Sequence, residues 1–183
     1  MFALTPRLTL RPGWPEDAPA LARAIAHEAV VTRLARVPWP YAPEDAATFL
    51  SLPRAATEPR FVILERGGAH RLIGGIGLHR ADNGDHELGY WLTPDAWGRG
   101  YASEAGHAVI QMARHALPIT RIAAYHHVDN PASGHVLRKL GFVETGRSQR
   151  HALARGGMVE AVDFALDLDA PDARVDAAMP IAA

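Results

Sequence analysis

The sequence predicts a single α/β (α+β) domain with a mixed, mostly antiparallel central sheet of about seven strands flanked by four helices. Hydrophobic periodicity and turn residues order the expected elements as β-α-α-β-β-β-α-β-α-β-β, with no internal repeat and no long linker. The length of 183 residues suits one domain, and a hydrophobic content of 48% is enough for a buried core. We therefore expect a folded globular protein.

The first third of the chain is expected to contain one strand and two helices. Residues 7–11 alternate between polar and apolar side chains, as a half-buried strand does. Proline followed by two acidic residues is typical of the first turn of a helix, and this pattern occurs at 15–17 and again at 43–45. The loop at 37–41, rich in proline and aromatic residues, lies between the two helices.

The rest of the domain is expected to begin with three consecutive strands, at 61–65, 72–79 and 86–92, separated by Gly-Gly and Asn-Gly turns. The elements expected after them are helices at 103–114 and 130–140 and strands at 121–127, 142–150 and 158–168. The domain is thus expected to span residues 1–168. Residues 169–183 show no periodicity and are expected to form a mobile or loosely docked tail.

The composition argues against several classes of function. The net charge is −1, so no overall field attracts nucleic acid or an anionic membrane surface. The absence of cysteine removes disulfides, thiolate zinc sites and cysteine nucleophiles, and ten histidines without HExxH spacing give no reason to expect a metal. No signal-peptide pattern opens the chain, and no apolar run approaches the ~18 residues of a membrane span. We expect a cytoplasmic protein.

Residues 87–105 carry the strongest functional signal. They read as a strand, a short turn and a glycine-spaced entry into a helix, with Gly98 and Gly100 flanking Arg99 at the entry. Backbone N–H groups unobstructed by side chains, together with the positive end of the helix dipole, favour a phosphate or pyrophosphate ligand. A glycine pair of this kind also occurs in ordinary tight turns, so the motif alone leaves both interpretations open.

Two common nucleotide-binding motifs do not fit this loop. A dinucleotide-binding fingerprint requires an acidic residue about 20 residues downstream, where the chain has Thr120, Arg121 and Ile122. A Walker-type loop requires Gly-Lys-Ser/Thr, and the only lysine of the chain is Lys139. The phosphate-bearing ligand is therefore expected to be of another kind.

Four sequence blocks, in a fixed order, link the chain to a known family. They are RLTLRP at 7–12, GGIGL at 74–78, the stretch at 87–105, and NPAS at 130–133 followed by LRKLGF at 137–142. In this order they resemble the GNAT superfamily of acyl-CoA-dependent N-acyltransferases, and most of all its RimJ/RimL-like branch of protein N-terminal acetyltransferases. The resemblance covers residues 5 to 168 and implies a GNAT-type domain with acetyl-CoA as co-substrate.

The resemblance also implies where CoA binds. The family's phosphate loop, Gln/Arg-x-x-Gly-x-Gly/Ala, stands here as WGRGYA at 97–102 and departs from the pattern only at Trp97. Because its contacts are chiefly backbone amides, we expect CoA binding to tolerate this change. The expected CoA contacts are Trp91, Leu92, Trp97, Gly98, Arg99, Gly100, Tyr101, Ala102, Ser103, Asn130, Ser133 and Lys139.

Glu87 is the candidate general base. In the reaction that the resemblance implies, an amine attacks the thioester carbonyl, and an α-amino group with a pKa of about 8 must first lose its proton. Strand alternation puts Glu87 on one face with Trp91, and Tyr90 on the other. The carboxylate would act directly or through water. Alternatively, Glu87 is a solvated strand residue close to the hairpin turn. The oxyanion donor that the resemblance implies is a backbone N–H near Trp91 and Leu92.

Ser133 is the candidate general acid. Many GNAT members use a tyrosine five residues before the Phe of their Gly-Phe signature to protonate the departing thiolate, but that position here is Leu137. In the RimJ/RimL-like branch the serine of Asn-x-x-Ser is proposed instead, and Ser133 occupies it. Asn130 is expected to cap the helix and to reach toward the pantetheine arm. Alternatively, Ser133 only hydrogen-bonds backbone in the first helical turn.

The acceptor side is expected to include Trp39, Tyr41 and Glu87, because the loop between the first two helices borders the acceptor site in this family. The same aromatic loop could equally serve rigid packing. The acceptor is expected to be a protein N-terminus or a small-molecule amine, with no nucleic acid or membrane partner. A non-catalytic acyl-CoA-binding module is the alternative function, and both a monomer and a homodimer are open.

Overall fold

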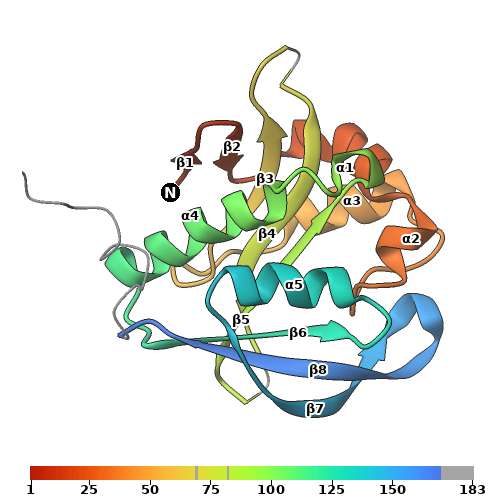
Figure 1. Cartoon of the computed structure of the whole chain (residues 1–183). Coiled ribbons are helices and arrows are strands. Elements are labelled where there is room, and N and C mark those ends of the chain that lie inside the picture. Colours follow the sequence, from red (N-terminus) through yellow and green to blue (C-terminus); the bar gives the residue numbers. More distant parts are fainter. Residues whose placement is uncertain (69, 82, 170–183) are drawn as a thin grey trace, which may run out of the picture.

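One eight-stranded sheet organises residues 1–68, 70–81 and 83–169, which the computed structural model describes (Figure 1). Its strand order is β1-β2-β3-β4-β5-β6-β8-β7. The strands are β1 (Ala3–Leu4), β2 (Leu8–Arg11), β3 (Arg60–Glu65), β4 (Leu72–Arg80), β5 (His86–Leu92), β6 (Arg121–His127), β7 (Val143–Ala152) and β8 (Gly157–Asp167). The helices are α1 (Ala18–Ile25), α2 (Glu28–Val31), α3 (Pro43–Ser51), α4 (Tyr101–Ala116) and α5 (Pro131–Lys139).

The predicted fold class is confirmed, with small differences in the count of elements. The described strand pairs are antiparallel except β5–β6. The unexpected elements are β1, of two residues, and α2, of four, and elements this short show no periodicity in a sequence. Residues 170–183 lie outside the described residues, so the domain boundary and the character of the tail stay predictions.

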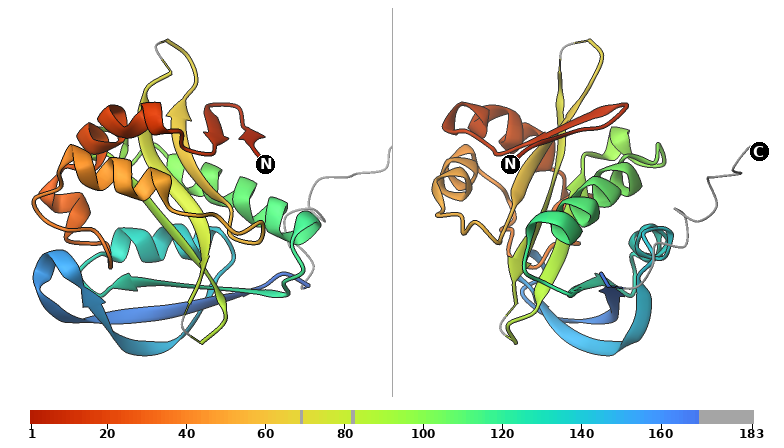
Figure 2. Two further views of the ribbon diagram at one scale, coloured as in Figure 1. Left: turned by 180° about the vertical axis from the view of Figure 1, so that it is seen from behind. Right: turned by 90° about the vertical axis from the view of Figure 1, so that its left-hand side faces the viewer.

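Helices cover the two faces of the sheet. Figure 2 shows α1 and α3 on one face and α4 with α5 on the other. The alternation of β3 fits this arrangement: Phe61 and Ile63 belong to the core cluster that contains Val109 of α4, whereas Val62 belongs to the cluster of α1 and α3. Both faces of β3 are therefore buried under helices, whereas most residues of β7 are exposed.

A gap opens between β5 and β6. These parallel strands pair only at His86 with Ile122 and at Glu87 with Ala123. On its other side, β5 stays paired with β4 as far as Leu92. Beyond Glu87, the β6-facing edge of β5 therefore has no strand partner within the described part of the chain.

The glycines of β4 make room for the last residues of β5. A Cβ added to Gly75 would lie 2.7 Å from Nε1 of Trp91, so the indole lies directly over the glycine. Trp91 packs against the clusters of α1–α3 and of α2, the side of the sheet that Glu87 also faces. Tyr90 packs against the cluster on the α4–α5 side. The two faces of β5 therefore offer different chemistry.

Candidate active site

The glycine-spaced loop has the backbone conformation that the sequence predicted. After β5, the chain makes a short 3₁₀ turn and enters the 16-residue helix α4 through Gly98 and Gly100, whose φ angles are 71° and 79°. Both values lie in the left-handed region that glycine adopts without strain. Gly100 is the N-cap of α4. The first N–H groups of this helix therefore point out of its end, where an anionic ligand is favoured.

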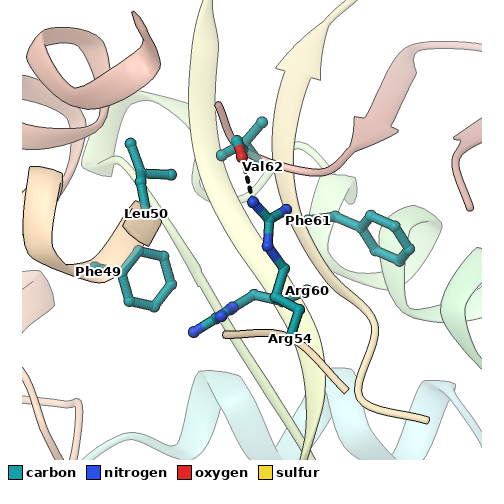
Figure 3. A pocket seen from close by; sticks show the side chains of 7 residues that line it. Phe49, Leu50, Arg54, Arg60, Phe61 and Val62 are labelled. Atoms are coloured by element: carbon teal, nitrogen blue, oxygen red, sulfur yellow. Dashed lines mark hydrogen bonds between the residues drawn. The ribbon is translucent and has the colours of Figure 1, made fainter. Parts of the chain in front are cut away.

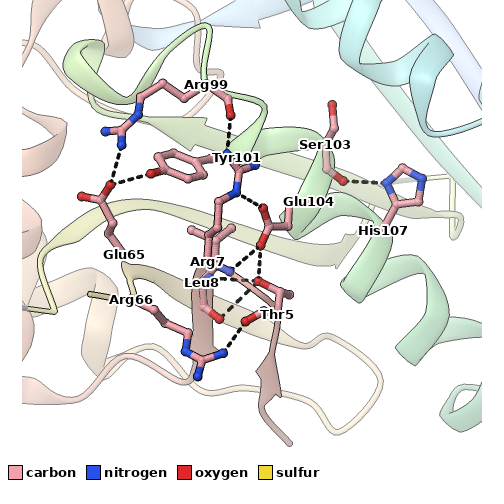
Figure 4. Close-up of polar contacts among 10 residues, drawn as sticks. All are labelled: Thr5, Arg7, Leu8, Glu65, Arg66, Arg99, Tyr101, Ser103, Glu104 and His107. Carbon is pink, nitrogen blue, oxygen red and sulfur yellow. Dashed lines mark hydrogen bonds and ion pairs between the residues drawn. The ribbon is translucent and has the colours of Figure 1, made fainter. Parts of the chain in front are cut away.

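Figure 4 shows how the N-terminal segment braces this loop. Arg7 donates from Nη1 to the carbonyl of Arg99 at 2.9 Å and from Nε to the carboxylate of Glu104 at 2.7 Å. Arg99 forms an ion pair with Glu65 at 3.0 Å. The ring of Tyr101 lies between the guanidinium groups of Arg7 and Arg99, at 4.6 and 4.7 Å from their central carbons. Because the Tyr101 side chain is buried, its expected CoA contact can come only through backbone.

Trp97, the one departure from the family's loop pattern, has a local structural role. Its indole Nε1 donates to the carbonyl of Leu92 at 2.8 Å. This bond joins the start of the loop to the end of β5. The indole face remains partly exposed, with the guanidinium of Arg33 5.2 Å from its centroid. Trp97 thus holds the loop against β5, at the position where the family pattern has Gln or Arg.

Helix α5 contacts α4 at its C-terminal end and Tyr90 of β5 at its N-terminal end. At its C-terminal end, Leu140 packs on Gly106 of α4, where an added Cβ would lie 2.5 Å from the leucine Cδ1. Lys139 precedes this contact, so it belongs to the same end of the helix. At the other end, Asn130 occupies the N-cap position of α5, but its side chain makes no capping hydrogen bond. The prediction that Asn130 caps the helix through its side chain is therefore wrong. Instead, the backbone carbonyl of Asn130 accepts a hydrogen bond from the N–H of Ser133.

Ser133 contacts a residue that the sequence analysis did not select. The phenol oxygen of Tyr90 lies 2.7 Å from Oγ of Ser133, and the phenol O–H also donates to the Ser133 carbonyl at 3.2 Å. Burial raises the pKa of Tyr90 to about 12, although the hydrogen bond to Ser133 acts in the opposite direction. The sequence signal was available in the alternation of β5, which turns Tyr90 away from Glu87 and toward α5.

Glu87 is buried, with 5% of its surface exposed. Its alternative interpretation as a solvated strand residue is therefore wrong. Oε1 lies 3.2 Å from Nε2 of His79, the residue directly opposite on β4. Oε2 lies 3.5 Å from Nη1 of Arg150 on β7. The carboxylate is thus held between two groups that can donate to it.

A polar cavity of about 390 Å³ opens beside this carboxylate. It is lined by Ala35, Arg36, His79, Ala81, Glu87, Tyr125, Gln149, Arg150 and His151. Trp39 and Tyr41 are not among the lining residues. Tyr41 instead packs against the two apolar clusters of α1–α3 and α2, and burial raises its pKa to about 12. The loop before α3 does border the cavity, but through Ala35 and Arg36.

A second hollow, beside α3, is too small to hold a substrate. Figure 3 shows it between Phe49, Leu50 and the start of β3. Arg54 donates there to the carbonyl of Gly13 at 2.8 Å. The hollow has room for about 10 Å³, which is no more than a single water molecule needs. The cavity beside Glu87 is therefore the better candidate for an acceptor site.

Two further negative findings concern the described residues alone. No group of three or more His, Asp or Glu side chains within residues 1–68, 70–81 and 83–169 is arranged to hold a metal ion. In the same part of the chain, none of the helices combines the length and the apolar character needed to cross a bilayer.

Similarity to known proteins identifies the family of this chain. Residues 7–143 match a family model described as an acetyltransferase (GNAT) domain. The chain is 31% identical over 157 residues to the uncharacterized N-acetyltransferase YoaA of Bacillus subtilis, covering 83% of this chain and 88% of that protein. Its fold is similar to a GNAT-family acetyltransferase from Bacillus anthracis (TM-score 0.79, 22% identity, 93% and 100% of the two chains). It is also similar to the ribosomal L7/L12 α-N-protein acetyltransferase RimL in complex with coenzyme A (TM-score 0.78, 21% identity, 93% and 100%). This protein therefore belongs to the GNAT family of acetyltransferases.

Proposed function

We propose that this acetyltransferase moves the acetyl group of acetyl-CoA to a primary amine by direct attack, without an acyl-enzyme intermediate. The observation that carries the proposal is the gap beyond Glu87, where β5 leaves β6. The glycine loop lies at one end of β5, and the polar cavity lies at the other. Acetyl-CoA held along this gap would meet an amine held in the cavity, which is the proximity that a bimolecular transfer needs.

The proton of the incoming amine goes to Glu87, directly or through a water molecule. A primary ammonium group is not nucleophilic, so the proton must leave before or during attack. Glu87 is the buried carboxylate of the cavity wall, and His79 bridges it to the open part of the cavity because the His79 side chain is 42% exposed. This arrangement lets the proton pass from Glu87 through His79 to solvent.

The acetyl group then passes from the thioester sulfur to the amine nitrogen by an addition step followed by an elimination step. The amine nitrogen bonds to the thioester carbon, and the carbonyl oxygen takes up negative charge that a backbone N–H near Trp91 and Leu92 stabilises. The carbon–sulfur bond breaks, and Ser133 gives its hydroxyl proton to the departing thiolate. The nitrogen releases its second proton to Glu87, which has by then passed the first one to solvent. Tyr90 orients that hydroxyl and can return a proton to it, since the two oxygens lie 2.7 Å apart.

We assign CoA binding to the residues expected from the sequence. Structural observations support this assignment for the N–H groups after Gly100, for Arg99 and for Lys139. The outward-facing N–H groups after Gly100 suit the pyrophosphate. Arg99 contributes a guanidinium at the loop, and Lys139 lies at the α5 end that contacts α4. The similar fold of RimL, described in complex with coenzyme A, supports the same ligand here.

The acceptor is a primary amine, either on a small molecule or at a protein N-terminus. Similarity to ribosomal-protein acetyltransferases supports the protein acceptor, and the size of the polar cavity, about 390 Å³, supports the small molecule. A non-catalytic acyl-CoA-binding module is disfavoured because such a module needs no buried carboxylate beside a cavity. Burying a carboxylate costs free energy, and Glu87 is buried beside His79 and Arg150.

The test is release of free CoA thiol from acetyl-CoA in the presence of a panel of amines and N-terminal peptides. Glu87→Gln and Ser133→Ala are measured beside the unmodified protein, and acetyl-CoA binding is measured by calorimetry for all three. Turnover that is lost in the variants while binding persists would support the proposal. Binding without turnover on every acceptor would favour the binding module, and no acetyl-CoA binding would refute the proposal.

A further inference from the structure

The cavity beside Glu87 contains a cation that its neighbours do not neutralise. Two arginines line the cavity, Arg36 and Arg150. Arg150 is fully engaged, because its guanidinium lies 2.8 Å from Asp163 and 3.5 Å from Glu87 and stacks 4.4 Å above the ring centre of Tyr125. Arg36 forms no ion pair with any residue of the described chain. Burial raises the pKa of Tyr125, and the charge of Arg36 acts on this pKa in the opposite direction. The charge of Arg36 therefore acts within the cavity.

Among the other lining residues, Arg150 and Glu87 carry opposite charges and contact each other. Asp163, which is not part of the lining, also contacts Arg150. Arg36 is therefore the lining arginine that has no ion-pair partner among the described residues. A guanidinium in such a position is a good partner for a carboxylate or another oxyanion, which it can bind through two parallel hydrogen bonds.

An arginine without an ion-pair partner is a poor neighbour for a simple amine. Most primary amines arrive as cations, and a polyamine would bring further positive charge toward Arg36. An amine that also carries an anion does not meet this repulsion, because its negative group can contact Arg36 while its nitrogen approaches Glu87. The cavity volume of about 390 Å³ lies in the range of small-molecule sites.

We propose that the acceptor is a small amine that also carries an anionic oxygen group, as a free amino acid does, and that Arg36 binds this group. The inference rests on the proposed acetyl transfer and adds the substrate class. Arg36 selects the acceptor, whereas Glu87 takes its proton. Because both residues line one cavity, the amine and the anion belong to one short molecule.

The experiment measures kcat/KM for thiol release with matched pairs of acceptors. Each pair is an amino acid and its amide, in which the carboxylate charge is lost, and the series varies the number of carbons between amine and carboxylate. Spermidine serves as the polycationic acceptor, and peptides beginning with a neutral or an acidic dipeptide serve as N-terminal acceptors. We expect at least one free amino acid to exceed its amide about tenfold, with the difference falling as salt is added.

Variants at Arg36 separate selection from catalysis. Arg36→Gln is expected to lower kcat/KM for the free amino acid about tenfold by raising KM, with the amide little affected. Arg36→Lys should recover part of the preference because it keeps the charge. The control is Arg23→Gln on the exposed side of α1, outside the cavity lining, which should change neither acceptor.

The results that would overturn the inference are distinct from those that would overturn the proposed function. Equal rates for acids and amides, a preference for spermidine, or an equal effect of Arg36→Gln on both members of a pair would refute an anion site at Arg36 while acetyl transfer stands. Exclusive use of peptides would refute the small-molecule acceptor. Absence of transfer to every acceptor would refute both.

Discussion

The phenol oxygen of Tyr90, on β5, lies 2.7 Å from Oγ of Ser133, on α5. The two residues are 43 positions apart in the chain and come from a strand and from the first turn of a helix. With a pKa raised to about 12 by burial, Tyr90 remains protonated at neutral pH and can donate to the serine. In the proposed mechanism, the serine hydroxyl keeps its own proton for the departing thiolate.

Loss of either hydroxyl of this pair should slow acetyl transfer. We expect Ser133→Ala to reduce kcat by about 10²-fold, in the range typical of a lost general acid, and Tyr90→Phe to reduce it less, because Tyr90 acts through Ser133. The double variant should be no slower than Ser133→Ala, since both changes break one unit. Steady-state kinetics at saturating acetyl-CoA measure these values.

The control for this prediction is Ser51→Ala, which removes an exposed hydroxyl bonded to a helix carbonyl at the end of α3 and should leave kcat unchanged. Additive effects of Tyr90→Phe and Ser133→Ala would show that the two hydroxyls act independently. Such a result would contradict the orienting role of Tyr90.

Replacing Glu87 should remove the proton acceptor without removing acetyl-CoA binding. We expect Glu87→Gln to lower kcat/KM for the amine by about 10²- to 10⁴-fold. The residual rate should rise with pH, because more of the amine then arrives already deprotonated. Glu160→Gln, which breaks an exposed ion pair with Arg147, is the matched control and should keep full activity. A Glu87→Gln enzyme with an unchanged rate at neutral pH would exclude Glu87 as the base.

Alanine variants at two glycines with nearly equal φ angles can distinguish strain in the loop from loss of ligand binding. Gly98 and Gly156 have φ angles of 71° and 68°, and a Cβ at either would meet no atom within 4 Å. Alanine at either position should therefore cost a similar free energy of unfolding, about 1 kcal/mol. Only Gly98→Ala should also weaken acetyl-CoA binding, by about tenfold, because its side chain would obstruct the loop. Equal Kd values for the two variants by calorimetry would argue against CoA binding at this loop.

Stability should fall on mild acidification because of His127. This side chain is 1% exposed, and neither ring nitrogen has a hydrogen-bond partner among the described residues. Burial, assisted by the charge of Arg155 and opposed by Asp129, lowers the pKa of His127 below its ordinary value of 6.5. Between the lowered folded-state pKa and 6.5, the unfolded chain binds more protons than the folded one, so the free energy of unfolding falls as pH drops through this window. Above 6.5 this contribution to stability is fully present.

Urea unfolding at a series of pH values from 8 to 5 measures this effect. His127→Leu should flatten the pH dependence, whereas His135→Leu, at an exposed position of α5, should leave it as in the unmodified protein. An unchanged slope in His127→Leu would mean that other groups cause the loss of stability in acid.

The sequence predicted the fold well where elements were long enough to show periodicity. Strands β3 to β8 and helices α4 and α5 were found with small shifts at their ends. The short elements β1 and α2 were missed because two or four residues do not define a period. The glycine-spaced entry into α4 was predicted, and the left-handed angles of Gly98 and Gly100 explain why glycine occupies both positions.

The candidate site was predicted only in part, because its contacts join distant segments. The guanidinium of Arg150 reaches Glu87, 63 positions earlier in the chain, and no local sequence pattern indicates such a contact. The sequence did not identify Tyr90, because the family pattern places the tyrosine at the position of Leu137 on α5 and not on β5. Arg36 lies in a loop without periodicity, so nothing in the local pattern links it to the cavity.

The most direct test of this account is thiol release from acetyl-CoA with the matched acceptor panel, comparing the unmodified protein with Glu87→Gln. The account predicts that some amine is acetylated at a rate that Glu87→Gln lowers at least 10²-fold, while both proteins bind acetyl-CoA with similar Kd. Equal turnover by the two proteins, or no acetyl-CoA binding by either, would contradict it.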